Sequence, residues 1–376
     1  MKKIWLFLLL FAPILAAPAG ADANNNYVLG GFEASGHVVA GAGYEHFSND
    51  AVTEWTNDGT FPGVIGSYIP NVAAGVAPSP GQDNLMFYVD DVELDIIKSF
   101  GENIRLRADL EFGRLASGSF WNFNLQQAYV TANIPVGNGI EVLIGHFWGP
   151  AGFEEDDAYD NEIISWSILS RANLYPYILT GAKILYAFND LVELHVFVVN
   201  GLTNDTTAKI NDMPSFGASL RFNWGEEDSE STVGISPFFG PESNSNRHYT
   251  FGADIDWMVY VTDAFAIGGE GLFRQDNGFG GPNSRYLGGL FELYYDFTDS
   301  LYGVLRYTYA QQFQNTNGVL NLTGQKQQIH EASLAGGFWI TDATVIKVEA
   351  RFDFIDPAGA SNQTNIGGAL AMAYGF

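Results

Sequence analysis

Apolar and polar residues alternate along several long stretches of the chain. In residues 104–112 the apolar positions are Ile104, Leu106, Ala108, Leu110 and Phe112, and the positions between them are Arg105, Arg107, Asp109 and Glu111. Residues 216–224, 249–261 and 346–354 follow the same rule. Because successive side chains of a strand point to opposite faces, each stretch predicts a strand with one apolar face and one polar or charged face.

Connections of two sizes separate these stretches. Short ones, built from turn residues, lie at 100–103, 136–139, 188–190, 225–228, 262–263, 298–299 and 341–342. Long ones lie between them, at 48–83, 115–122, 149–176, 201–213, 240–247, 276–284, 311–327 and 356–363. Seven short connections that alternate with eight long ones require about sixteen strands. It predicts an all-β fold, a single transmembrane antiparallel up-and-down barrel with short periplasmic turns and long extracellular loops.

A soluble β-sandwich is the alternative, because its sheets also have one apolar face. Two features favour a transmembrane barrel over a soluble sandwich. The polar face is charged along whole strands, and the strands run to about 10–14 residues, longer than is usual in soluble sheets. Aromatic residues also precede the short turns, as in the interfacial girdle of a barrel; they are Phe100, Phe188, Trp224, Tyr260 and Phe297.

The first residues are typical of an export signal. Lys2 and Lys3 precede an apolar run from Ile4 to Ala17, and small residues follow up to Ala23. This pattern predicts a cleaved signal peptide over residues 1–23 and a barrel over residues 24–376. We therefore expect export through the periplasm to a bacterial outer membrane, with membrane lipid as a partner.

Composition excludes several classes of protein. The formal net charge of −26 argues against nucleic acid as a partner. The absence of cysteine excludes disulfides and thiol chemistry. The six histidines are scattered, and the sequence has neither an HExxH nor a GxSxG motif. We therefore expect no enzyme, no catalytic residues, no cofactor and no metal.

Several motifs carry a family resemblance. The chain ends in an alternating strand with a final Phe376, which resembles the terminal signature of bacterial outer-membrane proteins. The segments 109–113, 125–130, 144–150 and 199–201 resemble the OmpL-like β-barrel porins. The resemblance implies a porin fold, passive diffusion and a homotrimer, and it supplies no catalytic residues.

The third long connection, 149–176, is strongly acidic. Its carboxylates are Glu154, Glu155, Asp156, Asp157, Asp160 and Glu162. In 16-stranded general porins the third loop folds into the barrel, so we hypothesise that these residues line a constriction. The basic residues expected opposite them are Arg306, Lys347 and Arg351, with Arg107. Facing acidic and basic walls would create a transverse field that screens apolar solutes.

Two other interpretations of this loop stay open. It can be a solvated acidic loop at the cell surface. It can also bind Ca²⁺ through its carboxylates, although the spacing lacks the glycine of an EF-hand loop.

The positions that face the lumen carry more acidic than basic residues, and Asp109 and Glu111 are among the acidic ones. An acidic channel concentrates cations. We therefore expect a passive porin for small hydrophilic solutes and ions with weak cation preference. The alternative is a surface-binding or structural barrel, an adhesin or receptor, with a plugged lumen.

Overall fold

The structure is a computed structural model that describes residues 27–29, 31–47, 83–112, 123–155, 157–202, 212–226, 229–242, 246, 248–277, 283–314, 327–357 and 362–376. The expected signal peptide at 1–23, almost all of the connection at 48–83 and the acidic residue Asp156 lie outside the described residues. The division into signal peptide and barrel therefore stays a prediction.

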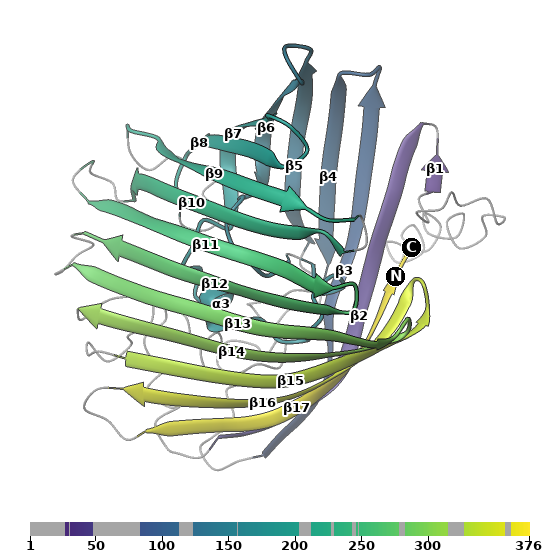
Figure 1. Ribbon diagram of the computed structural model, residues 1–376, viewed down its shortest axis with the longest axis vertical. Coiled ribbons are helices and arrows are strands. Elements are labelled where there is room, and N and C mark those ends of the chain that lie inside the picture. The colour runs from purple at the N-terminus through teal and green to yellow at the C-terminus, as the bar shows by residue number, and fades with distance from the viewer. Residues whose placement is uncertain are drawn as a thin grey trace, which may run out of the picture.

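Within the described residues, strands β2 to β17 form one closed antiparallel ring of 16 strands (Figure 1). The strands are β2 (Phe32–Phe47), β3 (Asp83–Phe100), β4 (Ile104–Phe112), β5 (Phe123–Ile134), β6 (Ile140–Trp148), β7 (Ile178–Ala187), β8 (Val192–Val199), β9 (Ser215–Trp224), β10 (Ser231–Pro241), β11 (Tyr249–Thr262), β12 (Phe265–Asp276), β13 (Ser284–Thr298), β14 (Leu301–Gln314), β15 (Gln327–Thr341), β16 (Thr344–Pro357) and β17 (Gln363–Gly375). A short strand β1 (Tyr27–Leu29) pairs with the beginning of β2 and is not part of the ring. The predicted all-β barrel is confirmed.

The ring closes between the first and last of its strands. β17 pairs with β2 from Asn365 opposite Phe47 to Gly375 opposite His37. Beyond this register the Gly36 amide donates to the Phe376 carbonyl at 3.0 Å, and the Phe376 amide donates to the Gly36 carbonyl at 2.9 Å. The final residue of the chain therefore completes the seam of the barrel.

The two faces of the barrel wall are inverted relative to a soluble protein. On β4, Ile104 is exposed whereas Asp109 and Glu111 are buried. Large apolar side chains such as Phe87 and Leu334 are likewise exposed on the outside. An apolar surface of this extent is unfavourable in water, and a lipid bilayer removes that cost. In the alternating stretches, the apolar residues therefore face lipid and the polar residues face the barrel interior.

The short connections join strand pairs at the predicted positions, and Phe100, Phe188, Trp224 and Phe297 are exposed near them. This agrees with an aromatic girdle at the interface. Tyr260 was expected in the same girdle, and that expectation is wrong. Its side chain lines a cavity inside the barrel. The next residue, Val261, is exposed instead, because neighbouring residues of a strand point to opposite faces.

Because the outer face of the barrel is apolar, a charged residue placed on it should lower the stability of the barrel. Leu334 lies midway along β15 and is 64% exposed. We expect Leu334→Arg to reduce the free energy of unfolding by about 2–4 kcal/mol, because a charge near the bilayer midplane is poorly solvated. The matched variant Ile340→Arg, next to the turn that ends β15, should cost only about 0–1 kcal/mol. Urea unfolding in lipid vesicles measures both, and equal costs would contradict the depth assignment.

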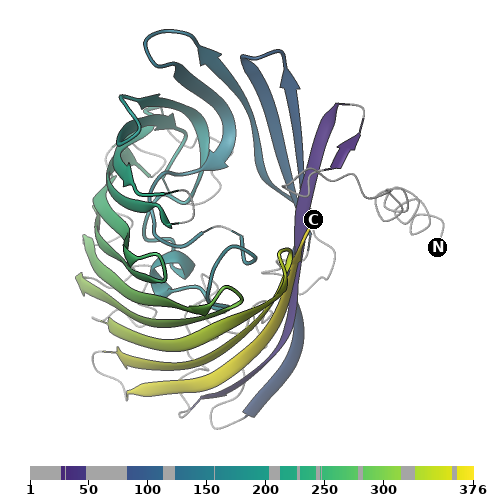
Figure 2. The same cartoon turned by 45° about the vertical axis from the view of Figure 1, so that its right-hand side comes forward.

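Residues 149–177, called the third loop below, connect β6 to β7 and carry the short helix α3 (Ile168–Arg171). Both views show α3 inside the ring of strands (Figures 1 and 2). Among the described residues, no helix has the length and apolar character needed to cross a membrane.

Candidate functional site

The third loop leaves and rejoins the barrel wall at one place, since the Gly149 amide donates to the Tyr177 carbonyl at 2.7 Å. From there its backbone crosses the inside of strands distant in sequence. The Pro150 carbonyl accepts hydrogen bonds from Arg221 of β9 and from Ser236 of β10, both at 3.3 Å. The Gly152 amide donates to Asp254 of β11 at 3.1 Å. These contacts hold the beginning of the loop against the inner wall rather than above the barrel.

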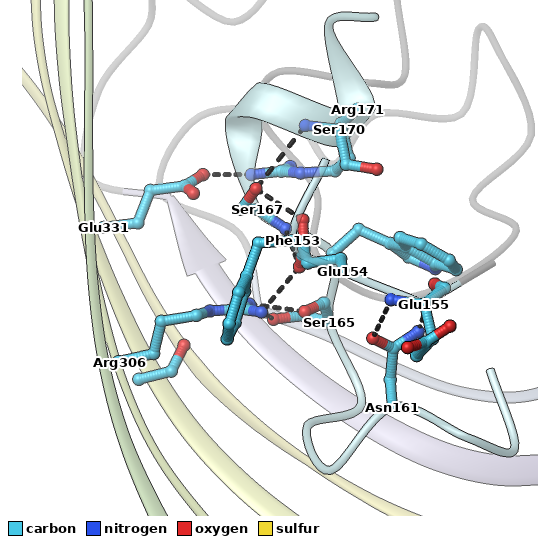
Figure 3. Close-up of polar contacts among 12 residues, drawn as sticks. Phe153, Glu154, Glu155, Asn161, Ser165, Ser167, Ser170, Arg171, Arg306 and Glu331 are labelled. Atoms are coloured by element: carbon cyan, nitrogen blue, oxygen red, sulfur yellow. Dashed lines mark hydrogen bonds and ion pairs between the residues drawn. The ribbon is translucent and has the colours of Figure 1, made fainter. Parts of the chain in front are cut away.

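Arg306 of β14 anchors the next part of the loop (Figure 3). Its guanidinium donates to Glu154 at 2.6 Å, and both side chains are at least 95% buried in this ion pair. It also donates to the Ser165 carbonyl. Glu154 in turn accepts from the Ser167 amide at 2.8 Å and from the Ser167 hydroxyl. One ion pair therefore ties together two parts of the loop and a barrel strand.

β16 supplies two further basic anchors. The Lys347 ammonium donates to the carbonyls of Ala158, at 3.0 Å, of Tyr159, at 2.8 Å, and of Asn161. Arg351 donates to the Ser165 hydroxyl at 2.7 Å and to the Trp166 carbonyl at 3.0 Å. Lys347 is surrounded by carbonyls of the loop, so it is satisfied only while the loop stays in place, whereas Arg351 also pairs with Glu331 and Asp353 of the wall.

Helix α3 is fixed at both ends by β15. Ser167 is its N-cap, and the Ser167 hydroxyl accepts from the Ser170 amide at 3.4 Å. The Ile168 amide donates to Glu331 at 2.8 Å, and Arg171 at the other end forms an ion pair with the same carboxylate. A carboxylate at the first turn complements the unpaired amides there, so Glu331 orients the helix as well as holding it.

Apolar packing accompanies these polar contacts. Ile168, Leu169 and Leu174 of the loop are fully buried in a cluster inside the barrel. The barrel side of this cluster includes Phe197, Leu272, Tyr286, Ile329 and Ile355. Burial of each large side chain contributes about 1.5–3 kcal/mol. The loop therefore fills part of the lumen as a small hydrophobic core.

Two glycines of the wall allow this close approach. A Cβ atom at Gly288 of β13 would lie 2.4 Å from Leu169, and one at Gly268 of β12 would lie 2.5 Å from Phe153. Real Cβ atoms are not found that close to other atoms, so a larger residue at either position would force the Leu169 or Phe153 side chain of the loop to shift.

The structure separates the basic residues that were expected to act together. Arg306, Lys347 and Arg351 contact the loop itself, so they do not form a second wall across an opening from it. Arg107 lies on β4, where it pairs with Asp109 at 2.7 Å and with Asp95 at 3.4 Å. The expected picture of facing acidic and basic walls is corrected in this respect, because burial of the loop backbone requires donors and the nearest basic residues supply them.

Carboxylates also lie beside Arg107 on the same face of the wall. Asp109 accepts a second hydrogen bond from Gln127 of β5 at 2.6 Å, and Glu111 is buried beside it on the same face of β4. These residues face the interior, as the alternation indicated.

The acidic residues of the third loop fall into two groups. Glu154, Glu155 and Glu162 line a cavity of about 510 Å³ between the loop and the barrel wall, where strands β7 to β11, β13 and β14 contribute residues. Asp157 instead points towards β2 and β3, and Asp160, one helical turn further on, is exposed. The loop thus brings carboxylates to two different sides of the barrel interior.

The cavity is charged on all sides. Its lining contains seven carboxylates and three Lys or Arg side chains. The carboxylates are Glu154, Glu155, Glu162, Glu193, Glu230, Asp256 and Glu292, and the basic residues are Lys183, Arg221 and Arg306. Lysine and arginine side chains therefore offset only part of the acidic charge, and the lining suits hydrated ions and polar solutes better than apolar ones.

Burial changes the protonation of the loop carboxylates. The pKa of Asp157 is raised to about 7, chiefly by burial; His37 acts to lower this pKa, and the nearby charges of Asp160 and Asp91 act to raise it. Burial also raises the pKa of Glu162. Near neutral pH the loop therefore carries less negative charge than its formal count.

The family of the chain follows from its sequence. The family described as "Putative beta-barrel porin-2, OmpL-like" matches residues 35–376. The chain belongs to this porin family. The resemblance found in the sequence is thereby confirmed, and membership implies a channel-type barrel of the bacterial outer membrane.

Solved structures similar to this porin are outer-membrane channels and porins. The outer membrane channel DcaP of Acinetobacter baumannii has a TM-score of 0.65 at 13% identity, covering 93% of this chain and 99% of that one. An anion-selective porin from Comamonas acidovorans has a TM-score of 0.61 at 11% identity, covering 92% and 99%. The trimer form of OmpT from Vibrio cholerae has a TM-score of 0.55 at 10% identity, covering 92% and 99%. No curated protein matches the porin by sequence. At these identities the likeness establishes the fold.

Sequence reasoning missed the apolar part of this porin's interior. Leu272, Tyr286, Ile329 and Ile355 occupy lumen-facing positions of their strands, yet they are buried against the loop. One signal was present in the sequence. Leu272, Ile329 and Ile355 share strand faces with Glu270, Glu331 and Asp353, and Tyr286 shares one with Glu292, so each interrupts a face that also carries a buried carboxylate.

Proposed function

We propose that this porin is a passive diffusion channel for small hydrophilic solutes and ions, and that its third loop sets the narrowest passage. The observation that supports this is the path of the loop, which binds the inner faces of β9 to β11, β14 to β16 and, through its tip, the side of β2 and β3. A barrel of sixteen strands is wide enough for an aqueous channel, so a loop across it restricts what passes.

Conductance across a planar lipid bilayer tests this proposal. Purified, folded barrel should insert and give stable, ohmic current steps in KCl. Heat-modifiable migration on a gel provides the check that the barrel is folded. If folded protein gives no channels, the diffusion proposal is wrong.

The charge of the lining supports a weak preference for cations. The cavity lining has seven carboxylates and three basic side chains, and this excess of acidic groups attracts cations. In a KCl gradient we expect a reversal potential that corresponds to a K⁺ to Cl⁻ permeability ratio above one, on the order of a few-fold. Glu155→Gln and Glu162→Gln should each lower this ratio. The matched variant Glu226→Gln, in an exposed turn, should leave it unchanged, and an anion-selective wild type would refute the proposal.

One observation favours the alternative of a plugged, surface-binding barrel. The hydrophobic core around Leu169 and Tyr286 occludes part of the lumen. The same bilayer experiment separates the two functions, because a plugged barrel would insert without conducting. A homotrimer is a further proposal, supported by the trimer form of the similar OmpT.

A further inference from the structure

The tip of the third loop meets the barrel wall at a group of potential metal ligands. His37 of β2, Asp91 and Glu93 of β3, and Asp157 of the loop each bring one ligand atom to a common point, and these atoms all lie within 4.8 Å of one another. The closest pair is His37 Nε2 and Asp91 Oδ2, at 2.8 Å. Four ligands from three separate segments therefore converge there.

The strand register explains why three of them lie together. His37 is directly opposite Glu93, and Val39 is opposite Asp91. A bulge follows, because Ala40 pairs with Val89 and the residue between, Asp90, is left over. Asp91 and Glu93 therefore both face the interior beside His37, and all three side chains are buried.

Buried oxygen atoms in this group lack hydrogen-bond partners. Glu93 is only 2% exposed and its Oε2 atom has no partner among the described residues. The same holds for Oδ1 of Asp91, which is 1% exposed, and for Oδ1 of Asp157. A buried carboxylate oxygen without a donor or cation is costly, so these atoms point to a positively charged ligand.

The surroundings do not supply that charge. Glu93 belongs to a second close group with Asp95 and Asp109. Arg107 on the adjacent strand β4 is engaged with Asp109 and Asp95. The loop adds Asp157 to this excess of carboxylates, and like charges at such distances repel unless a cation lies between them.

We propose that His37, Asp91, Glu93 and Asp157 bind one divalent transition-metal ion of the Zn²⁺ type, which links the loop tip to the wall. One imidazole with three carboxylates suits Zn²⁺ and its neighbours. Ca²⁺ and Mg²⁺ favour sites made of oxygen ligands alone. The His37 ring stacks on Tyr159 of the loop, with ring centroids 5.9 Å apart, which orients the imidazole towards the carboxylates.

Metal binding to the whole barrel in detergent, after removal of metals with EDTA, tests this site. Titration with ZnCl₂ in a calorimeter should give saturable binding of one ion per chain. Titration with CoCl₂ should give a visible absorption band from a metal–imidazole complex. His37→Gln and Asp157→Asn should each weaken Zn²⁺ binding about tenfold or more.

Two variants serve as matched controls. His195→Gln changes another interior histidine that pairs with a carboxylate, Glu193 at 3.1 Å. Glu155→Gln removes a carboxylate charge from the same loop, on the side that lines the cavity rather than at the loop tip. Both controls should bind Zn²⁺ as the wild type does. Asp157 belongs to no strand, so its variant tests the site even if His37→Gln fails to fold.

Each outcome of these titrations either supports or contradicts the proposed metal site. Loss of binding in the two site variants with retention in the two controls supports the site. Absence of saturable Zn²⁺ binding in the wild type overturns it, as does equal loss in the controls. Binding of Ca²⁺ as tight as that of Zn²⁺ overturns the assigned class of metal. None of these measurements requires the barrel to conduct, so the test of the metal site is independent of the test of the channel function.

Discussion

Replacement of residues 150–176 by a two-residue Asn-Gly turn is expected to raise the single-channel conductance at least about twofold. The third loop binds strands around much of the inner wall, so its removal opens the cross-section of the lumen. The β6–β7 pairing should survive, because Gly149 and Tyr177 are already hydrogen-bonded neighbours. An Asn-Gly turn suits a connection between antiparallel strands.

The shortened barrel should also be less stable. Its interior would expose Leu272, Tyr286 and Ile329, which the loop now covers, and each loses part of a burial contribution of about 1.5–3 kcal/mol. Far-UV circular dichroism and heat-modifiable migration check that the barrel remains folded. A folded, shortened barrel with wild-type conductance would mean that the loop does not set the passage.

Arg306→Met is expected to destabilise the docked loop by about 3–5 kcal/mol, because the variant leaves the buried Glu154 carboxylate without its cation. Ser167 still donates to Glu154, but the link from Glu154 to β14 is lost, and the Tyr302 hydroxyl remains bonded to the Glu162 carbonyl. We expect noisier open-channel currents and faster proteolysis within the third loop. Current recordings and limited proteolysis measure these two effects.

A double-mutant cycle isolates the ion pair. In Glu154→Gln/Arg306→Met the uncompensated charge is gone, so part of the loss should be recovered. Arg285→Met is the control, since Arg285 is exposed and its hydrogen bond is to Gln275 within the wall. If Arg285→Met and Arg306→Met had equal effects, the Arg306–Glu154 pair would not be an anchor of the loop.

The barrel could be predicted because its signals are local. Alternation along 104–112 and turn pairs such as Thr262-Asp263 and Thr341-Asp342 each involve residues that are neighbours in the chain. Strand pairing in an up-and-down barrel follows chain order, so local signals suffice to define the ring.

The interior could be predicted only in part. Composition marked the third loop as acidic, but its partners lie far along the chain; Glu154 and Arg306 are 152 residues apart. No alternation rule tells which basic residue will receive a loop carbonyl, as Lys347 does. The bulge beside Val39 was also invisible, since it depends on the pairing of β2 with β3 rather than on either strand alone. His37 looked like one of several scattered histidines because its place opposite Glu93 depends on the register between β2 and β3.

The seam formed by Gly36 and Phe376 has a consequence for how this protein folds. Every other pairing in the ring joins strands adjacent in the chain and can form as a local hairpin, whereas β2 must wait for β17. Closure therefore pairs the first and last strands of the ring, which are the farthest apart in sequence. Bringing them together has a high entropic cost. Until the last strand is in place, both outer strands are open edges prone to pairing with other chains. Assembly should thus be rate-limited by its final step, and a chain truncated before β17 should aggregate rather than form a smaller ring.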